Sequence, residues 1–196
     1  MGRRSEHSKE ELATLIVDQA FNLIEEHGYN QLSTRKIAAN IGYTVGMLYN
    51  LFTSIDDVIV HVNGRILDML LQEMSSAAAQ HKDPKEKLRA IAWAYYGLSE
   101  SRFHLWSTLF EYRFPDDMRL PGWYSDKIRI VYEFAGAIIK EASPKEDHIT
   151  TTALFWSGVH GITSLMSHGK LSRVGFANGG QLMSSFLDKF CSSLKK

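Results

Sequence analysis

The chain has 196 residues, and its 22 basic and 22 acidic side chains give a formal net charge of zero. This length suits one small module joined to one larger domain, and the neutral balance excludes a general electrostatic attraction to nucleic acids. The single cysteine, Cys191, cannot form an internal disulfide, and the N-terminal MGRRSEHSKEEL lacks a signal peptide's apolar run. We therefore expect a cytoplasmic protein. No apolar run approaches the roughly 20 residues of a membrane helix, so we expect it to be soluble, without a membrane partner.

The first predicted helix begins with a capping box of Ser8 and Glu11 and ends near Gly28. Its apolar stripe consists of Leu12, Leu15, Ile16, Ala20, Leu23 and Ile24. Arg3 and Arg4 precede this helix, either as a solubilising tail or as an arm that contacts DNA phosphates.

Residues 28–58 have the pattern of two short helices joined by a glycine turn, with a third helix directly after them. Gly42 stands where a helix ends in a left-handed residue, and we expect Thr44 to cap the next helix through its hydroxyl. The outer face of that next helix carries short or hydrogen-bonding residues, namely Thr44, Gly46, Tyr49 and Asn50. No carboxylate occurs between His27 and Asp56, so a polyanion meets no repulsion there. The pattern predicts a helix-turn-helix that binds DNA.

The same segment resembles the DNA-binding domain of the TetR family of bacterial repressors. The matching residues are Gly28-Tyr29, Arg35-Lys36-Ile37-Ala38, Gly42-Tyr43-Thr44-Val45-Gly46-Met47-Leu48-Tyr49 and Phe52-Thr53-Ser54. The resemblance implies that Thr34, Arg35, Thr44, Val45, Gly46, Met47, Tyr49 and Asn50 lie near DNA, with Tyr49 on a phosphate. Val45 and Ile55 stand where the family usually has lysines, and Leu51 stands where an aromatic residue or histidine is common.

Beyond this segment, Ser54 and Asp57 predict the cap of a long linking helix over 54–80. A further helix is then predicted, with Asp83 as its cap and Pro84 as its first residue. Glu86 is the expected return partner of this capping box. Helical stretches follow at Phe103–Tyr112 and at Trp123–Ile139, and Ser143-Pro144-Lys145-Glu146 predicts the start of a helix over about 146–168. Four glycines, at 169, 175, 179 and 180, mark a loop before a last helix. We expect an all-α protein with a DNA-binding domain at 1–53 and a second domain at 81–196.

The second domain is rich in aromatic residues, because 12 of the chain's 22 Phe, Trp and Tyr residues lie between Trp93 and Phe134. Such rings can line a small-molecule site, although ordinary core packing is the alternative for each of them. The predicted ligand-binding residues are Trp93, Tyr96, His104, Trp106, Phe110, Trp123, Trp156 and His160. Glu111 is a further candidate for a polar contact.

The last two helices are predicted to form a homodimer interface. The first of them is apolar nearly all round, and the other has one apolar stripe, so pairing across a two-fold axis would give a four-helix interface. The alternative is that both pack into their own domain. The predicted interface residues are Phe155, Val159, Ile162, Met166, Met183, Phe186 and Phe190. Trp156, His160 and Gly161 also resemble a Trp-x-x-x-His-Gly signature of one TetR subgroup.

The sequence predicts no enzyme, cofactor or metal site. Its His, Asp, Glu and Cys residues do not fall at zinc-ligand spacings, and no phosphate loop or nucleophile elbow is present. We expect a ligand-responsive transcriptional regulator, and a repressor is the favoured interpretation. We expect it to bind a palindromic operator as a homodimer and to be released by a small apolar or aromatic effector. The alternative is a small-molecule binding protein of the same fold with weak or lost DNA binding.

Overall fold

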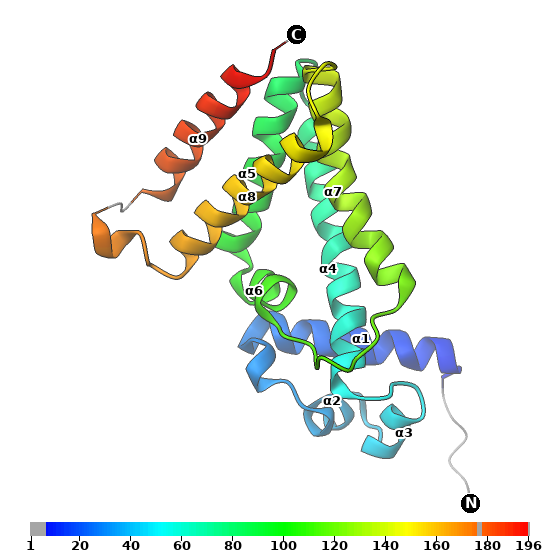
Figure 1. Cartoon of the computed structure of the whole chain (residues 1–196). Coiled ribbons are helices and arrows are strands. Elements are labelled where there is room, and N and C mark those ends of the chain that lie inside the picture. The colour runs from blue at the N-terminus through cyan, green and yellow to red at the C-terminus, as the bar shows by residue number, and fades with distance from the viewer. Residues whose placement is uncertain (1–6, 176–177, 196) are drawn as a thin grey trace, which may run out of the picture. The chain divides into compact units, whose positions relative to one another are not determined.

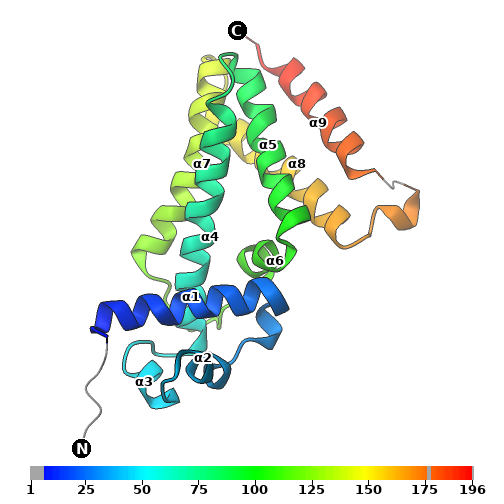
Figure 2. The same cartoon turned by 180° about the vertical axis from the view of Figure 1, so that it is seen from behind.

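The computed structural model describes residues 7–175 and 178–195, and every regular element in this part of the chain is helical (Figures 1 and 2). The α-helices are α1 (Lys9–His27), α2 (Thr34–Ile41), α3 (Val45–Tyr49), α4 (Ile55–Ala78), α5 (Pro84–Ser101), α6 (Phe103–Glu111), α7 (Gly122–Ala142), α8 (His148–Ser167) and α9 (Gly179–Ser193). Two short 3-10 turns, Tyr29–Gln31 and Ser172–Val174, lie between them. The all-α prediction is confirmed. Arg3 and Arg4 lie outside the described residues.

The described chain forms two compact units, and each is treated by itself. The head unit contains residues 7–66 and 104–124, and the body unit contains residues 67–103, 125–175 and 178–195. The predicted domain bounds, 1–53 and 81–196, differ from this division, because residues 104–124 group with the N-terminal helices. None of the helices described is both long and apolar enough to cross a bilayer.

The head unit begins with α1, whose capping box is present as predicted. The Glu11 amide donates to Ser8 Oγ at 3.2 Å, and the Ser8 amide donates to the Glu11 carboxylate at 2.7 Å. The helix ends at Gly28, which has a φ of 78°. Its apolar stripe is buried except for the half-buried Leu15, with Ile16, Ala20 and Ile24 fully inaccessible to solvent, and α1 packs on α2. Burial of this face holds the small head together.

Two further predicted caps are present. The Asp57 amide donates to Ser54 Oγ at 3.2 Å before α4, and the Lys85 amide donates to the Asp83 carboxylate at 3.1 Å before α5. The predicted return hydrogen bond from the Glu86 carboxylate to this cap is not formed. That carboxylate pairs with Arg89 at 3.2 Å instead, one turn further along the same helix.

The helix predicted over about 146–168 is present as α8, but the predicted cap at Ser143 was wrong. Asp147 caps this helix, accepting hydrogen bonds from the amides of Ile149 and Thr150 at 3.1 and 3.4 Å. The Ser143 hydroxyl donates to the Lys195 carbonyl instead of capping a helix, and Ser143 is fully buried. The predicted glycine loop before α9 was also too long, because Gly179 and Gly180 form the first turn of α9, capped by Asn178.

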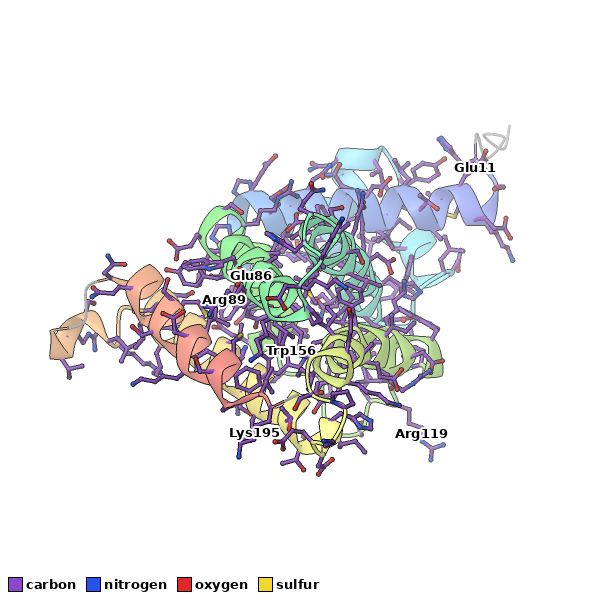
Figure 3. All side chains as sticks on the ribbon, turned by 90° about the horizontal axis from the view of Figure 1, so that it is seen from above. Glu11, Glu86, Arg89, Arg119, Trp156 and Lys195 are labelled. Carbon is purple, nitrogen blue, oxygen red and sulfur yellow. The ribbon has the colours of Figure 1, made fainter. Side chains whose placement is uncertain are left out.

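In the body unit, α8 packs against both α5 and α9. The ring of Phe155 on α8 lies 5.4 Å from that of Phe190 on α9, measured between centroids. Arg89 on α5, which Figure 3 labels beside Glu86, donates to the Asp188 carboxylate on α9 at 2.7 Å. The arginine is half-buried and the aspartate is exposed, so solvent screens this ion pair and it adds little to the stability that the apolar contacts supply.

Candidate DNA-binding surface and effector site

The helix-turn-helix is built from α2, the turn at Gly42 and α3. Gly42 has a φ of 73° and a ψ of 24°, which is the left-handed conformation that glycine adopts without a Cβ penalty. Its amide donates to the Ala39 carbonyl at 3.3 Å, and the Tyr43 amide donates to the Ala38 carbonyl at 2.9 Å. These bonds satisfy the carbonyls at the end of α2 and turn the chain into α3.

The cap of α3 differs from the prediction in one detail. Thr44 occupies the N-cap position, but its side chain makes no capping hydrogen bond. The Met47 amide donates to the Thr44 backbone carbonyl at 3.0 Å. The Thr44 hydroxyl therefore lies on the exposed surface without a capping role, as a DNA-contacting group would.

The residues predicted to lie near DNA belong to the first turn of α2 and to α3 with its flanking residues. Arg35, Thr44, Gly46, Tyr49 and Asn50 are exposed, and Thr34, Val45 and Met47 are half-buried. Tyr49 has 53% of its surface accessible although it is a large aromatic residue. The opposite side of α3 is anchored by Leu48, which is buried. A buried anchor and an exposed polar face are what a groove-binding helix requires.

The nearest carboxylates along the chain are engaged within the head unit. The Asp57 carboxylate accepts hydrogen bonds from the Thr53 amide at 2.9 Å and from the Thr53 hydroxyl at 3.2 Å. The Asp56 carboxylate accepts from the Tyr112 hydroxyl at 2.5 Å. Burial raises the pKa of Tyr112 above its ordinary value, and the hydrogen bond to Asp56 raises it further. Both acidic groups also lie in the first turn of α4, where the helix dipole favours a negative charge.

Four of the predicted ligand-binding residues, His104, Trp106, Phe110 and Trp123, lie in the head unit. The ring of Trp106 lies 5.5 Å from that of Phe110 on α6. His104 donates through Nδ1 to the Glu25 carbonyl at 3.0 Å, near the end of α1. Trp123 lies beside His61, with 5.1 Å between ring centroids. His104 and Trp123 thus have structural neighbours within the head.

The other four lie in the body unit and form two pairs. Trp93 and Tyr96 pack edge to face on α5, with centroids 5.7 Å apart. Trp156 and His160 lie one turn apart on α8, and both contact Tyr95 of α5. Tyr95 shares a hydrogen bond of 2.6 Å with His160 Nδ1. The structure therefore brings Trp156 and His160 together around a residue that the sequence analysis had not selected.

The buried polar atoms without a hydrogen bond to any residue that the structure describes include Asn63 Oδ1 in the head unit and Trp156 Nε1 in the body unit. Leaving a buried polar group unsatisfied costs about 1–3 kcal/mol, so each marks a place where a ligand or water can bind. Sequence analysis missed Asn63. The sequence feature that could have pointed to it is its side-chain amide within the largely apolar α4 segment Val58–Leu67.

Two hollows on the surface are lined by other residues. One of about 390 Å³ lies in the head unit and is lined by Ala13, Thr14, Val17, Asp18, Leu51, Phe52, His61 and Arg65. The other, of about 480 Å³, lies between α7 and α8 and is lined by Arg129, Tyr132, Glu133, Gly136, Ala137, Lys140, His148, Ile149 and Thr152. Neither includes a predicted ligand-binding residue.

The predicted dimer residues divide by burial within one chain. Phe155, Val159 and Met183 are fully buried, whereas Ile162, Met166, Phe186 and Phe190 are half-buried. The buried three are covered by neighbouring helices of their own unit and leave no surface for a second copy. The exposed face of α8 carries other residues, namely Ala153, Leu154, Ser157 and Leu165.

Cys191 is a packed thiol. It is buried, its Sγ lies 3.7 Å from the Lys85 carbonyl, and burial raises its pKa above the ordinary value. A raised pKa leaves less of the reactive thiolate at neutral pH. No group of three or more potential metal ligands occurs within residues 7–175 and 178–195.

Two family models match the chain. The model described as "Bacterial regulatory proteins, tetR family" matches residues 16–62, which include α2, the Gly42 turn and α3. The model described as "Tetracyclin repressor-like, C-terminal domain" matches residues 88–190, more than half of the chain. Together they cover both the head helices and the α5–α9 region.

A curated relative is the fatty acid metabolism regulator protein of Bacillus subtilis (strain 168), which is 26% identical over 83 residues. The match covers 42% of this chain and 43% of that protein, so it spans less than half of the relative. A solved protein of unknown function from Rhodococcus sp. RHA1 covers 100% of both chains, with a TM-score of 0.80 and 16% identity. The transcriptional regulator FadR from Bacillus subtilis, in complex with stearoyl-CoA, covers 93% of this chain and 99% of its own, with a TM-score of 0.70 and 18% identity. These structures show a shared fold.

Proposed function

Because the chain belongs to the TetR family of bacterial regulatory proteins, we propose that it is a homodimeric, cytoplasmic transcriptional repressor that binds a palindromic operator. A small apolar or aromatic effector releases it from DNA. In this proposal the effector favours a conformer in which the two recognition helices no longer match the spacing of the half-sites, which are about 34–36 Å apart per helical turn. Such coupling between sites typically amounts to about 1–3 kcal/mol.

The observation that carries the proposal is the exposed polar face of α3 on a well-anchored turn. Thr44, Gly46, Tyr49 and Asn50 are exposed, and the chain has no carboxylate between His27 and Asp56. We propose that Arg35 and Tyr49 contact phosphates. Thr34, Thr44, Val45, Met47 and Asn50 lie at the groove edge, and Gly46 permits close approach of the backbone.

An effector with an apolar body is supported by the aromatic surroundings of α5 and α8 and by the stearoyl-CoA in the solved FadR structure. The proposed effector residues are the members of the predicted set in the body unit, namely Trp93, Tyr96, Trp156 and His160, of which Trp156 and His160 are brought together. The proposed dimer uses the exposed face of α8 together with the half-buried Ile162, Met166, Phe186 and Phe190. Apolar side chains exposed along one helix face are a common basis of symmetric interfaces.

The alternative function, a ligand-binding protein that has lost DNA binding, is favoured by Val45 and Ile55, which replace usual family lysines. Fluorescence anisotropy with duplex DNA from the region upstream of the protein's own gene distinguishes the two at low salt. Saturable binding supports the regulator, and no binding above that to a scrambled duplex supports the alternative.

Two variants then test the residue roles. Tyr49→Phe should weaken binding to operator and scrambled DNA alike, because a phosphate contact is independent of sequence. Asn50→Ala should instead reduce the preference for the operator, because a base contact is specific. Unchanged affinity of both variants for both duplexes would contradict the assigned surface.

A further inference from the structure

Trp156 and His160 belong to the body unit, whereas the proposed DNA-binding residues belong to the head unit. Both side chains are half-buried and contact Tyr95. Trp156, which Figure 3 labels, and His160 are separated by four residues on α8 and therefore face the same side of the helix. Both rings pack edge to face against Tyr95 of α5, at centroid distances of 5.5 and 6.3 Å. Tyr95 is itself buried and holds His160 through their 2.6 Å hydrogen bond.

The Trp156 indole nitrogen is buried and has no hydrogen-bond partner among the residues described. An indole N–H can only donate, so the group that satisfies it must offer an acceptor atom. A buried donor of this kind is normally paired. The donor lies among the rings of Tyr95 and Phe155, and small-molecule sites typically combine apolar surroundings with a few polar groups of this kind.

We propose that the Trp156 indole N–H donates a hydrogen bond to a neutral carbonyl oxygen of the effector, as found in an ester, a thioester or an amide. The inference rests on the proposed function, because it defines the chemistry of the effector site. The body of the ligand is apolar, since Tyr95 and Phe155 surround Trp156 with rings.

The acceptor is neutral rather than a carboxylate, because no cation among the residues described is left over to offset a buried negative charge there. The α8 helix carries no lysine or arginine, and His160 is engaged by Tyr95 through Nδ1. Arg89 of α5 is paired with Glu86 and Asp188.

Nuclear magnetic resonance of the full chain with ¹⁵N-labelled indoles tests this contact directly. Three matched probes differ at one group: methyl benzoate has a neutral carbonyl, ethylbenzene has no acceptor, and benzoate is an anion. Methyl benzoate should move the Trp156 N–H signal downfield in a saturable manner, whereas ethylbenzene and benzoate should not. The signals of Trp93, Trp106 and Trp123 serve as internal references. The Trp156 signal is assigned as the one that disappears in Trp156→Phe.

The same variant measures the energetic role of the contact. Trp156→Phe keeps an aromatic ring but removes the donor, so methyl benzoate should bind about fivefold more weakly, in line with one neutral hydrogen bond. Its affinity for ethylbenzene should stay within about twofold of wild type, because that ligand uses no donor. An equal loss for both ligands would show a packing defect and would overturn the inference.

Further outcomes separate this inference from the proposed function. A Trp156 signal that none of the probes moves, up to their solubility limits, overturns the carbonyl contact even if the chain binds DNA. Conversely, a saturable shift with methyl benzoate in a chain that fails to bind DNA supports the contact and contradicts the repressor. A larger shift with benzoate than with methyl benzoate overturns the preference for a neutral acceptor.

Discussion

Tyr112 donates a hydrogen bond through its hydroxyl to Asp56 Oδ1 at 2.5 Å. The same tyrosine ring packs edge to face on Tyr29, with 5.3 Å between centroids. Tyr112 follows α6, whereas Asp56 lies in the first turn of α4 and Tyr29 follows α1. Together with the bond from His104 to the Glu25 carbonyl, these contacts explain why residues 104–124 group with the head helices.

Removing the Tyr112 hydroxyl should destabilise the head unit. Because the acceptor is a carboxylate, Tyr112→Phe should lower the free energy of unfolding by about 1–2 kcal/mol at pH 7, measured by urea denaturation followed by circular dichroism. Tyr132→Phe is the matched control, since that hydroxyl is 3.4 Å from the Ile149 carbonyl and exposed. Its effect should stay within about 0.5 kcal/mol. Equal losses in the two variants would contradict the role of Asp56.

The same contact predicts a dependence on alkaline pH. Burial and the bond to Asp56 raise the pKa of Tyr112 in the folded chain, whereas an unfolded tyrosine ionises near about pH 10. The stabilisation is thus fully present below about pH 10 and is lost as the pH rises toward the folded pKa. Wild-type stability should fall as the pH rises above about 10, and that of Tyr112→Phe should fall less steeply. Burial also raises the pKa of Tyr124. Because Tyr124 is present in both the wild type and Tyr112→Phe, its contribution cancels when the two are compared.

Gly42 should resist substitution because of its backbone conformation alone. A Cβ there would meet no atom within 4 Å, so the cost of Gly42→Ala comes from its φ of 73° and should be about 1 kcal/mol. Gly42→Asn should cost less, because asparagine tolerates the left-handed region. Gly122→Ala, in the same unit and also without a close neighbour, should change stability by less than about 0.5 kcal/mol. Similar midpoints of urea denaturation for Gly42→Ala and Gly122→Ala would contradict this account.

Gly158 is required by the close approach of α9. A Cβ there would lie 2.2 Å from Phe186 Cζ, so Gly158→Ala should cost about 1–2 kcal/mol through overpacking, despite a better helix propensity. Gly161→Ala, one turn later with no atom within 4 Å, should stabilise the helix by up to about 1 kcal/mol. In the background of Phe186→Ala, the penalty of Gly158→Ala should disappear in thermal unfolding. A persistent penalty would locate the cause elsewhere.

Leu154 should be important for the proposed dimer. It is 60% exposed in one chain, on the same face of α8 as Ser157 and Leu165, so a charge there would be buried in an interface. Leu154→Arg should shift light scattering after gel filtration from the dimer mass toward the monomer mass. Val174→Arg is the control, because Val174 is 70% exposed and lies on the short turn before α9. A dimer that survives Leu154→Arg would place the interface on another face.

The extent of sequence-based prediction can be judged from individual residues. The caps at Ser8 and Asp83 were found because a cap involves groups only a few residues apart. The cap of α8 was missed because Ser143 and Asp147 competed for it. The choice depends on the Lys195 carbonyl, 52 residues away, which engages the Ser143 hydroxyl. Likewise, the burial of Phe155 depends on Phe190 of another helix.

The amino-acid order alone determined the helices, the left-handed turn at Gly42 and the carboxylate-free face of α3. These features depend on local hydrogen bonds, on helical periodicity and on the absence of a side chain, all of which act within a few residues. Only the tertiary structure decided that Tyr112 meets Asp56, that Tyr95 holds His160 and that Trp156 buries a donor. Such contacts join residues that are distant in the chain, and packing of whole helices brings them together.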